Sequence, residues 1–152
     1  MNPLKKLEDA GRLESLQIER AQIAKLVKAA YQDLKEARVT FPVSDRAAYL
    51  FAYTAMLKAG RAVLFLRGRR PRGLGQHATV IEAAGLILGK DFASLTDLFD
   101  QARRKRNLLM YDTDVLISHA ETEKVFRSAQ DYLDKVRAFL EQQDPQLRFD
   151  FP

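Results

Sequence analysis

The sequence of 152 residues contains no cysteine and only two histidines, His77 and His119. The absence of cysteine excludes disulfide bonds, thiolate chemistry and cysteine-ligated zinc. Two histidines are too few for a multi-histidine metal site within one chain, so we expect neither a metal ion nor a cofactor. The sequence also lacks a phosphate-binding glycine loop, an HExxH helix, a GxSxG turn and a dinucleotide-binding fingerprint. The enzyme classes that depend on these motifs are therefore disfavoured.

Signals for export or membrane insertion are also missing from the sequence. The N-terminal segment MNPLKKLEDAGRLE is charged and has no apolar stretch of the kind found in signal peptides. The most apolar segment, residues 47–66, approaches the length of a membrane span, but Lys58 and Arg61 lie at its centre. Such charges are costly in lipid. We therefore expect a buried core helix, no membrane contact and a cytoplasmic location.

Length and charge set two further bounds. A chain of this length suits one domain with a substantial core, and we expect a single helical domain over residues 1–152. The formal net charge of +5 favours anionic partners. A surplus of this size does not by itself identify nucleic acid as the partner.

The spacing of apolar residues is helical along most of the chain, with no alternation typical of strands. It predicts four long helices, over residues 13–38, 44–69, 95–111 and 119–143. A shorter helix is expected over residues 77–88, and a helical turn before Gly11. Because the connections are short, neighbouring helices should be antiparallel. The predicted fold class is all-α, an antiparallel helical bundle of four long helices plus one short helix.

Residues that favour helix ends support several of these boundaries. Ser44 is a good N-cap for the second long helix, and Gly89 is a suitable stop for the short one. Ser94 and Asp97 have the spacing of a capping box that would open the next helix. The last long helix should end before Pro145.

Arg106 is the most informative polar residue of the chain, because it lies within an apolar stripe. In a helix over residues 95–112, this stripe is formed by Leu95, Leu98, Phe99, Ala102 and Leu109. Buried arginine is rare without a partner, so Arg106 requires a carboxylate, a second subunit or a bound anion. A structural pair with Asp100 or Asp112 is the simplest alternative to a functional role.

The residues after Arg106 suit the binding of a phosphate. An arginine fork donates two parallel hydrogen bonds to a phosphate and keeps its charge at any working pH. Asn107 offers both a donor and an acceptor beside it, and Tyr111 offers a hydroxyl. In a straight helix Arg106 and Tyr111 are about 140° apart. The two side chains therefore converge only if the helix ends between them or a second subunit contributes.

A second basic segment follows the second long helix, in a loop rich in glycine. Its arginines, which could hold phosphates, are Arg67, Arg69, Arg70 and Arg72. Arg103 lies on the flank of the Arg106 stripe and could join them. The loop has little of the aromatic interleaving that single-strand binders use, so a solvated surface is the alternative.

Each histidine has a structural and a functional interpretation. His77 begins the short helix, where the N-terminal dipole disfavours an imidazolium, so we expect a neutral ring. It could act as a base if the fold brings it near Arg106, and otherwise it is a cap or surface group. The same alternatives apply to His119, which begins the last helix.

The segment FDQARRKRNLLMYD resembles the signature helix of the HEPN superfamily (higher eukaryotes and prokaryotes nucleotide-binding domains). The family motif is an arginine, often followed by a polar residue, and then a histidine a few residues later, with tyrosine near that place in several branches. The upstream segments AYTAMLKAGRAVLFLRGRRP and QHATV also resemble a small bacterial branch of this superfamily. The resemblance covers about residues 47–112.

The resemblance implies a helical bundle that forms a homodimer, with the two motif helices facing each other across a cleft. Many members are metal-independent endoribonucleases, in which the ribose 2′-OH attacks the adjacent phosphate. For this chain it implies Arg106, Asn107 and Tyr111 as catalytic residues, with RNA or a nucleotide as the ligand. Members often belong to toxin–antitoxin pairs, so an antitoxin or a nucleotidyltransferase is an implied partner.

Tyr111 stands where most nucleases of the superfamily have the histidine. A phenol with a pKa near 10 is a poor base at neutral pH. The alternative function is therefore a non-catalytic dimeric interaction module that pairs with a nucleotidyltransferase or another partner.

Overall fold

The computed structural model describes residues 2–151 and shows a helical bundle. Its helices are α1 (Lys5–Asp9), α2 (Arg20–Thr40), α3 (Asp45–Leu66), α4 (Gln76–Leu88), α5 (Ala93–Tyr111) and α6 (His119–Gln143). A 3-10 turn, η1 (Lys90–Phe92), joins α4 to α5, and two short strands are β1 (Leu13–Ser15) and β2 (Arg69–Pro71). The predicted all-α class is confirmed.

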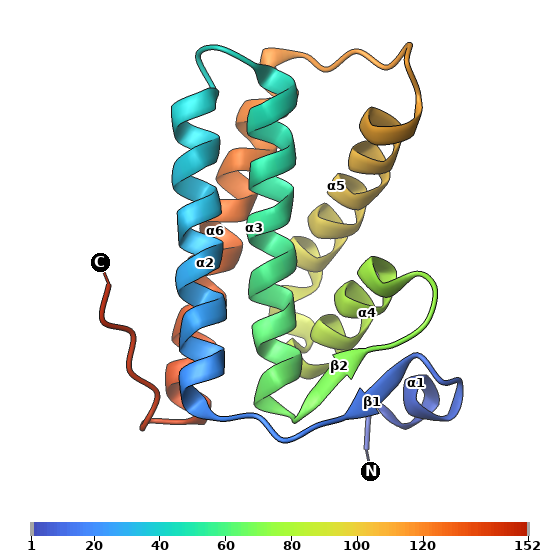
Figure 1. Ribbon diagram of the computed structural model, residues 1–152, viewed down its shortest axis with the longest axis vertical. Coiled ribbons are helices and arrows are strands. Elements are labelled where there is room, and N and C mark those ends of the chain that lie inside the picture. Colours follow the sequence, from blue (N-terminus) through green and yellow to red (C-terminus); the bar gives the residue numbers. More distant parts are fainter. Residues whose placement is uncertain (1, 152) are drawn as a thin grey trace.

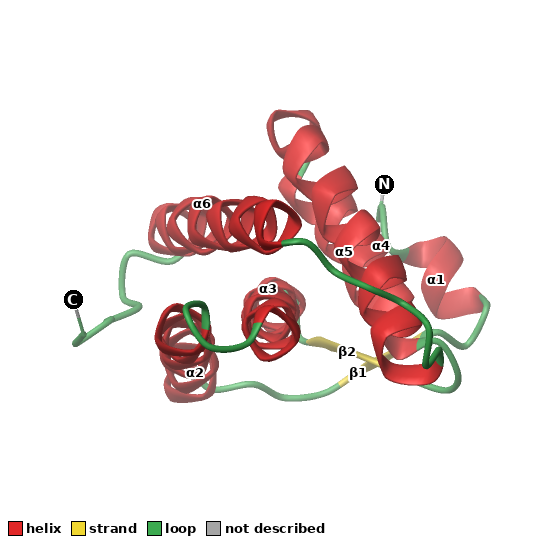
Figure 2. Cartoon of the chain, turned by 90° about the horizontal axis from the view of Figure 1, so that it is seen from above, coloured by secondary structure: helices red, strands yellow, loops and turns green. Residues whose placement is uncertain are grey.

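Helix α3 is the centre of the bundle. Helices α2, α3 and α6 stand side by side, while α5 leans away from them toward its C-terminal end (Figures 1 and 2). The short helix α4 packs against both α3 and α5, and α3 also contacts α2, α5 and α6. Alanines and Gly60 make up much of the buried surface of α3, and such small residues let neighbouring helices approach closely.

By length and composition, α3 is also the one helix within residues 2–151 that could cross a membrane. More than half of its apolar window, 56%, is buried inside the bundle. Lys58, in the middle of the helix, forms an ion pair with Asp33 of α2, with Nζ 2.7 Å from Oδ2. This arrangement is that of a core helix and is consistent with a soluble protein.

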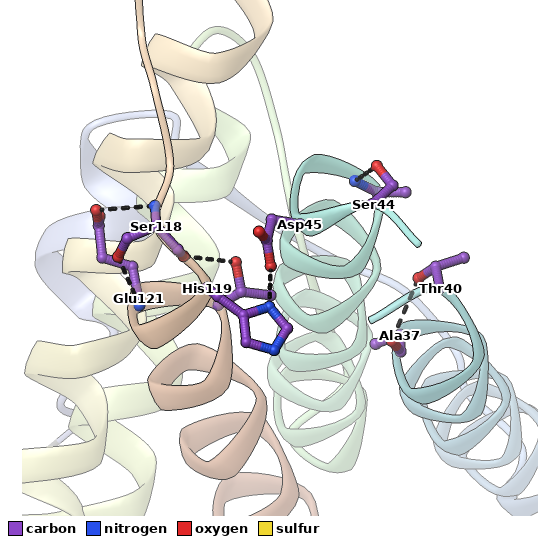
Figure 3. Close-up of polar contacts among 9 residues, drawn as sticks. Ala37, Thr40, Ser44, Asp45, Ser118, His119 and Glu121 are labelled. Carbon is purple, nitrogen blue, oxygen red and sulfur yellow. Dashed lines mark hydrogen bonds and ion pairs between the residues drawn. The ribbon is translucent and has the colours of Figure 1, made fainter. Parts of the chain in front are cut away.

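Serine caps begin α3 and α6, and Figure 3 shows both. The Ser44 hydroxyl accepts a hydrogen bond from the amide of Ala47 at 3.1 Å. Ser118 and Glu121 form a reciprocal capping box, with hydrogen bonds of 3.0 and 3.3 Å. These contacts satisfy amides that the first helical turn leaves free. The predicted boundaries of α6, residues 119 and 143, are those observed.

The predicted capping box of Ser94 and Asp97 does not form. Helix α5 begins earlier, at Ala93, directly after the 3-10 turn, with Phe92 at the N-cap and no side-chain cap. The predicted stop of α4 at Gly89 is confirmed, since this residue has a φ of 85° that favours glycine.

The prediction of a helix from residue 13 is wrong, because residues 13–15 form a strand instead. Leu13 lies opposite Pro71 and Ser15 opposite Arg69 in an antiparallel pair. The same pairing ends α3 at Leu66, three residues before the predicted end, because the chain turns at Gly68 with a φ of 64°. Leu13 is buried in the core, so the pairing also covers one end of the bundle.

Candidate functional site

Arg106 lies on α5, within the apolar stripe that the sequence predicted. It is half-buried between the buried residues Ala102 and Leu109. Its Nη1 atom donates a hydrogen bond to Oδ1 of the adjacent Asn107 at 3.2 Å. Within residues 2–151, no carboxylate lies at ion-pair distance from its guanidinium. The charge of Arg106 is therefore held in place but not neutralised.

Asp100 does not pair with Arg106, although the sequence offered it as a structural partner. It forms ion pairs with Arg103 at 3.0 Å and with Arg104 at 3.2 Å. The other alternative, Asp112, ends α5 as its exposed C-cap. A single carboxylate thus serves two arginines on this helix.

His77 and Tyr53 form the second part of the site. The Tyr53 hydroxyl lies 3.0 Å from Nδ1 of His77. Tyr53 comes from the core helix α3 and is 1% exposed, whereas His77, near the start of α4, is half-buried. Phe99 of α5 packs against the Tyr53 ring, with ring centroids 5.9 Å apart. The pair therefore joins α3 and α4, and α5 packs against it.

Burial and, to a smaller extent, nearby positive charges favour the neutral form of the His77 ring. Burial lowers the pKa of His77 below its ordinary value, and the positive charges of Arg106, Arg103 and Arg61 lower it further. Burial also raises the pKa of Tyr53, so its hydroxyl stays protonated at neutral pH. The sequence-based expectation of a neutral His77 is consistent with these effects, and burial is the larger cause.

A surface hollow of about 280 Å³ adjoins this pair. Its lining residues are Leu57, Arg61, Arg70, Pro71, Gln76, His77 and Val80. Arg61 lies over the Phe65 ring at 5.9 Å and has no carboxylate partner among the described residues. His77 thus borders the hollow and also experiences the positive charges of Arg103 and Arg106 on α5.

The structure separates the other predicted site residues. Tyr111 is the last residue of α5, so the helix does not end between it and Arg106, and at 80% exposed it points away from the bundle. Within one chain the predicted convergence of Tyr111 with Arg106 therefore does not occur. Arg69 forms an ion pair with Glu8 at 2.8 Å, and Arg67 contacts Gln143 at 3.5 Å. Arg70 pairs with Glu14 across the two strands and also lines the hollow. Of the predicted loop arginines, Arg70 alone borders His77.

His119 belongs to a different part of the fold. Its Nδ1 atom lies 2.7 Å from Oδ1 of Asp45 (Figure 3). Its ring also packs on Phe41, with ring centroids 3.9 Å apart. These contacts join the start of α6 to the connection between α2 and α3. These contacts are those of a structural group, the first of the two interpretations that the sequence left open for His119.

Sequence reasoning missed Tyr53 as a site residue, because it lies on a helix that is apolar on most sides. A signal for it does exist, since a buried tyrosine needs a hydrogen-bond partner for its hydroxyl. The two histidines of the chain are natural acceptors for the hydrogen bond of such a hydroxyl.

Comparisons with known proteins find no matching family model, no matching curated protein and no matching solved structure. A functional proposal therefore rests on the geometry of Arg106 and His77. In the described part of the chain, no three His, Asp or Glu side chains are grouped in a way that could hold a metal ion.

Proposed function

We propose that this chain is a HEPN-type protein that binds RNA or a nucleotide through a phosphate group at Arg106. The observation that carries the proposal is the environment of Arg106 on the inner stripe of α5. Asn107 lies beside its guanidinium, and no carboxylate of residues 2–151 lies at ion-pair distance from it. An anion is the partner that such an arginine lacks. The fold class, a bundle with Arg106 near the end of its fifth helix, agrees with the resemblance.

Local electrostatics support an anionic ligand. The positive charges of Arg106, Arg103 and Arg61 reach His77 from two helices, and Asp100 offsets only part of that charge. A phosphate at this place would receive the guanidinium fork of Arg106. Arg67 adds to the wider positive field, because its partner Gln143 is neutral, whereas Glu8 offsets the charge of Arg69.

Dimerisation and cleavage belong to the same proposal. In a homodimer, a second copy of α5 would bring its Tyr111 toward a site that is open within one chain. Cleavage would need no metal: the 2′-oxygen bonds to phosphorus, the bond to the 5′-oxygen breaks, and one proton passes from the 2′-OH to the 5′-oxygen through protein groups. Arg106 would stabilise the charge of the five-coordinate phosphorus. The proposed setting is a cytoplasmic toxin–antitoxin pair.

One observation favours the second candidate function, a non-catalytic interaction module. Apolar side chains are exposed at the end of α5 and in the loop after it, namely Leu108 at 48%, Tyr111 at 80% and Leu116 at 87%. Grouped exposed apolar residues are typical of protein-binding surfaces. An antitoxin or a nucleotidyltransferase would be the partner in that case.

Cleavage and binding of labelled RNA in EDTA test the proposal. Arg106→Ala should weaken RNA binding by about tenfold, because one charge-assisted fork contributes about 1–3 kcal/mol. Arg104→Ala is the matched control, since Arg104 lies on the same helix and its side chain is 74% exposed. Equal loss in both variants would contradict a site at Arg106.

The same assay separates the two functions. Cyclic phosphate ends formed by the wild type, and lost in Arg106→Ala, would identify a metal-independent endoribonuclease. Tyr111→Phe would then show whether the phenol takes part in proton transfer. A folded dimer that neither binds nor cleaves RNA would instead support the interaction module.

A further inference from the structure

We infer that Tyr53 holds His77 as the tautomer protonated at Nε2, so that His77 donates a hydrogen bond to the bound phosphate and does not act as the base. The identity of the ligand rests on the proposed function. The tautomer is a property of the free protein and can be measured without any ligand. His77 lies in the segment QHATV that the resemblance covers, but it is not one of the residues that the resemblance implies as catalytic, which are Arg106, Asn107 and Tyr111.

The hydrogen bond between Tyr53 and His77 runs from the tyrosine hydroxyl to the ring nitrogen. The Tyr53 hydroxyl is in the core, and Nδ1 of His77 is its one hydrogen-bond partner among residues 2–151. A buried hydroxyl must donate its proton to some acceptor, and this nitrogen is the acceptor in reach. If Nδ1 accepts, the single proton of a neutral imidazole is on Nε2.

The other ring nitrogen of His77, Nε2, is accessible from the hollow. This atom makes no hydrogen bond within the described chain, and it is not among the side-chain atoms there that are both fully buried and without a hydrogen bond. His77 also lines the hollow beside Arg61 and Arg70. Its N–H group is therefore open to a ligand.

The charged side chains around the Nε2–H group of His77 are arginines. The titratable groups that face His77 are Tyr53 and Arg61 on α3, Arg103 and Arg106 on α5, and Arg70 on β2. None of them is a carboxylate, so the Nε2–H group has no acceptor of its own in this set. Asp100 and Glu14 already form ion pairs with Arg103 and Arg70. A phosphate oxygen would supply the acceptor and would neutralise Arg61 and Arg106, which have no carboxylate partner among residues 2–151.

Two functional consequences follow from this tautomer. A ring with its proton on Nε2 has no free lone pair facing the ligand, so His77 cannot take the proton of a ribose 2′-OH. In addition, a bound phosphate offsets the arginine charges that now disfavour the imidazolium. Ligand binding should therefore raise the pKa of His77, and the affinity should increase as the pH falls.

Nitrogen NMR of the imidazoles tests the tautomer in the full-length protein. The chain has only two histidines, so His77→Gln assigns both signals. In the free wild type at neutral pH, we expect the Nε2–H form of His77. Tyr53→Phe, which removes only the hydroxyl, should lose this preference. Tyr132→Phe is the matched control, because Tyr132 is also buried in the core, and among residues 2–151 its ring packs on Phe99 and no hydrogen bond joins it to His77.

The ribodinucleotide UpU is the probe for the ligand, because its phosphodiester keeps one negative charge across the pH range in which histidine titrates. We expect UpU to shift the Nε2–H signal of His77 and to bind about three- to tenfold more weakly to Tyr53→Phe, the loss expected for one hydrogen bond. Tyr132→Phe should bind UpU like the wild type.

The outcomes distinguish this inference from the proposed function. An Nδ1–H tautomer in the free wild type would overturn the inference whatever the protein binds. UpU binding that depends on Arg106 but leaves the His77 signals and the Tyr53→Phe affinity unchanged would overturn the inference alone. The Nε2–H tautomer without any UpU or RNA binding would overturn the proposed function, and with it the phosphate contact of His77.

Discussion

Val80 of α4 packs directly onto Gly60 of α3, where a Cβ atom would lie 2.9 Å from the Val80 Cγ1 atom and 3.2 Å from Cε2 of Phe99. No such atom is present in glycine, so three helices meet closely at this point. His77 lies one turn before Val80, and Tyr53 lies two turns before Gly60. The close approach therefore sets the contact between Tyr53 and His77.

Gly60→Ala should destabilise the fold by about 1 kcal/mol. The added methyl group forces the buried Val80 and Phe99 side chains to move, which typically costs about 1–3 kcal/mol. The better helix propensity of alanine offsets about 1 kcal/mol of this loss. Urea unfolding measures the difference. Gly85→Ala is the comparison, because its Cβ would meet only the half-buried Thr96 side chain at 3.0 Å, so a smaller loss is expected. Equal stability of Gly60→Ala and the wild type would contradict the packing argument.

The ion pair between Lys58 and Asp33 gives a second prediction. The side chains are 30% and 14% exposed, so removing Lys58 leaves a mostly buried carboxylate without its partner. Lys58→Met should lower the free energy of unfolding by about 2 kcal/mol, less than the loss for a fully buried pair.

Two further variants test whether this loss comes from the unpaired charge. Adding Asp33→Leu to Lys58→Met should restore most of the stability, because apolar replacements of a buried pair are often neutral. Lys135→Ala removes an exposed partner of Asp131, with side chains 56% and 50% exposed, and should change stability by at most about 0.5 kcal/mol. A double variant as unstable as the single one would show that Lys58 acts through packing.

The salt dependence of RNA binding gives a third prediction. Each phosphate that a cation neutralises adds about one unit to the slope of log affinity against log salt concentration. Arg106→Ala should therefore reduce the slope by about one unit, in proportion to one lost phosphate contact. Arg104→Ala should leave most of the slope unchanged, because Arg104 is exposed and paired with Asp100. An unchanged slope in Arg106→Ala would place the bound phosphate elsewhere.

The sequence was sufficient for most of the helical architecture. The predicted bounds of α6 are those observed: Pro145 was its expected stop, and the structure adds a Ser118 cap at its start. The β1–β2 pair could not be predicted in the same way. It joins residues 13–15 to residues 69–71, and three residues on each side are too few to show an alternating pattern.

The site shows a similar division between local and long-range information. Helical periodicity alone places Arg106 on the inner stripe of α5, because its position depends only on its neighbours along the helix. The pairing of His77 with Tyr53 depends on how α3 and α4 pack, over 24 residues of sequence. Tyr111 was grouped with Arg106 from the motif, but the helix continues to Tyr111 and leaves its side chain exposed.

The buried tyrosines predict a loss of stability at alkaline pH. Burial raises the pKa of Tyr49 to about 12, with a smaller contribution from Glu121, and burial also raises the pKa of Tyr53 and Tyr132 above the ordinary value of 10.0. Above pH 10 the unfolded chain releases these protons while the folded chain keeps them. The unfolded state is then favoured increasingly as the pH rises from 10 toward 12.

Each such tyrosine should add about 1.4 kcal/mol per pH unit to this loss, until the folded protein also ionises. Tyrosinate absorbance and helical circular dichroism, followed together above pH 10, should therefore change in one cooperative step. Tyr49→Phe should make the loss of stability shallower by one such contribution. Tyr111→Phe, at a position that is 80% exposed, is the control and should leave the alkaline midpoint unchanged. If tyrosinate forms gradually while the helices remain folded, burial does not protect these hydroxyls, and the packing of Tyr49 against the start of α6 is looser than the structure shows.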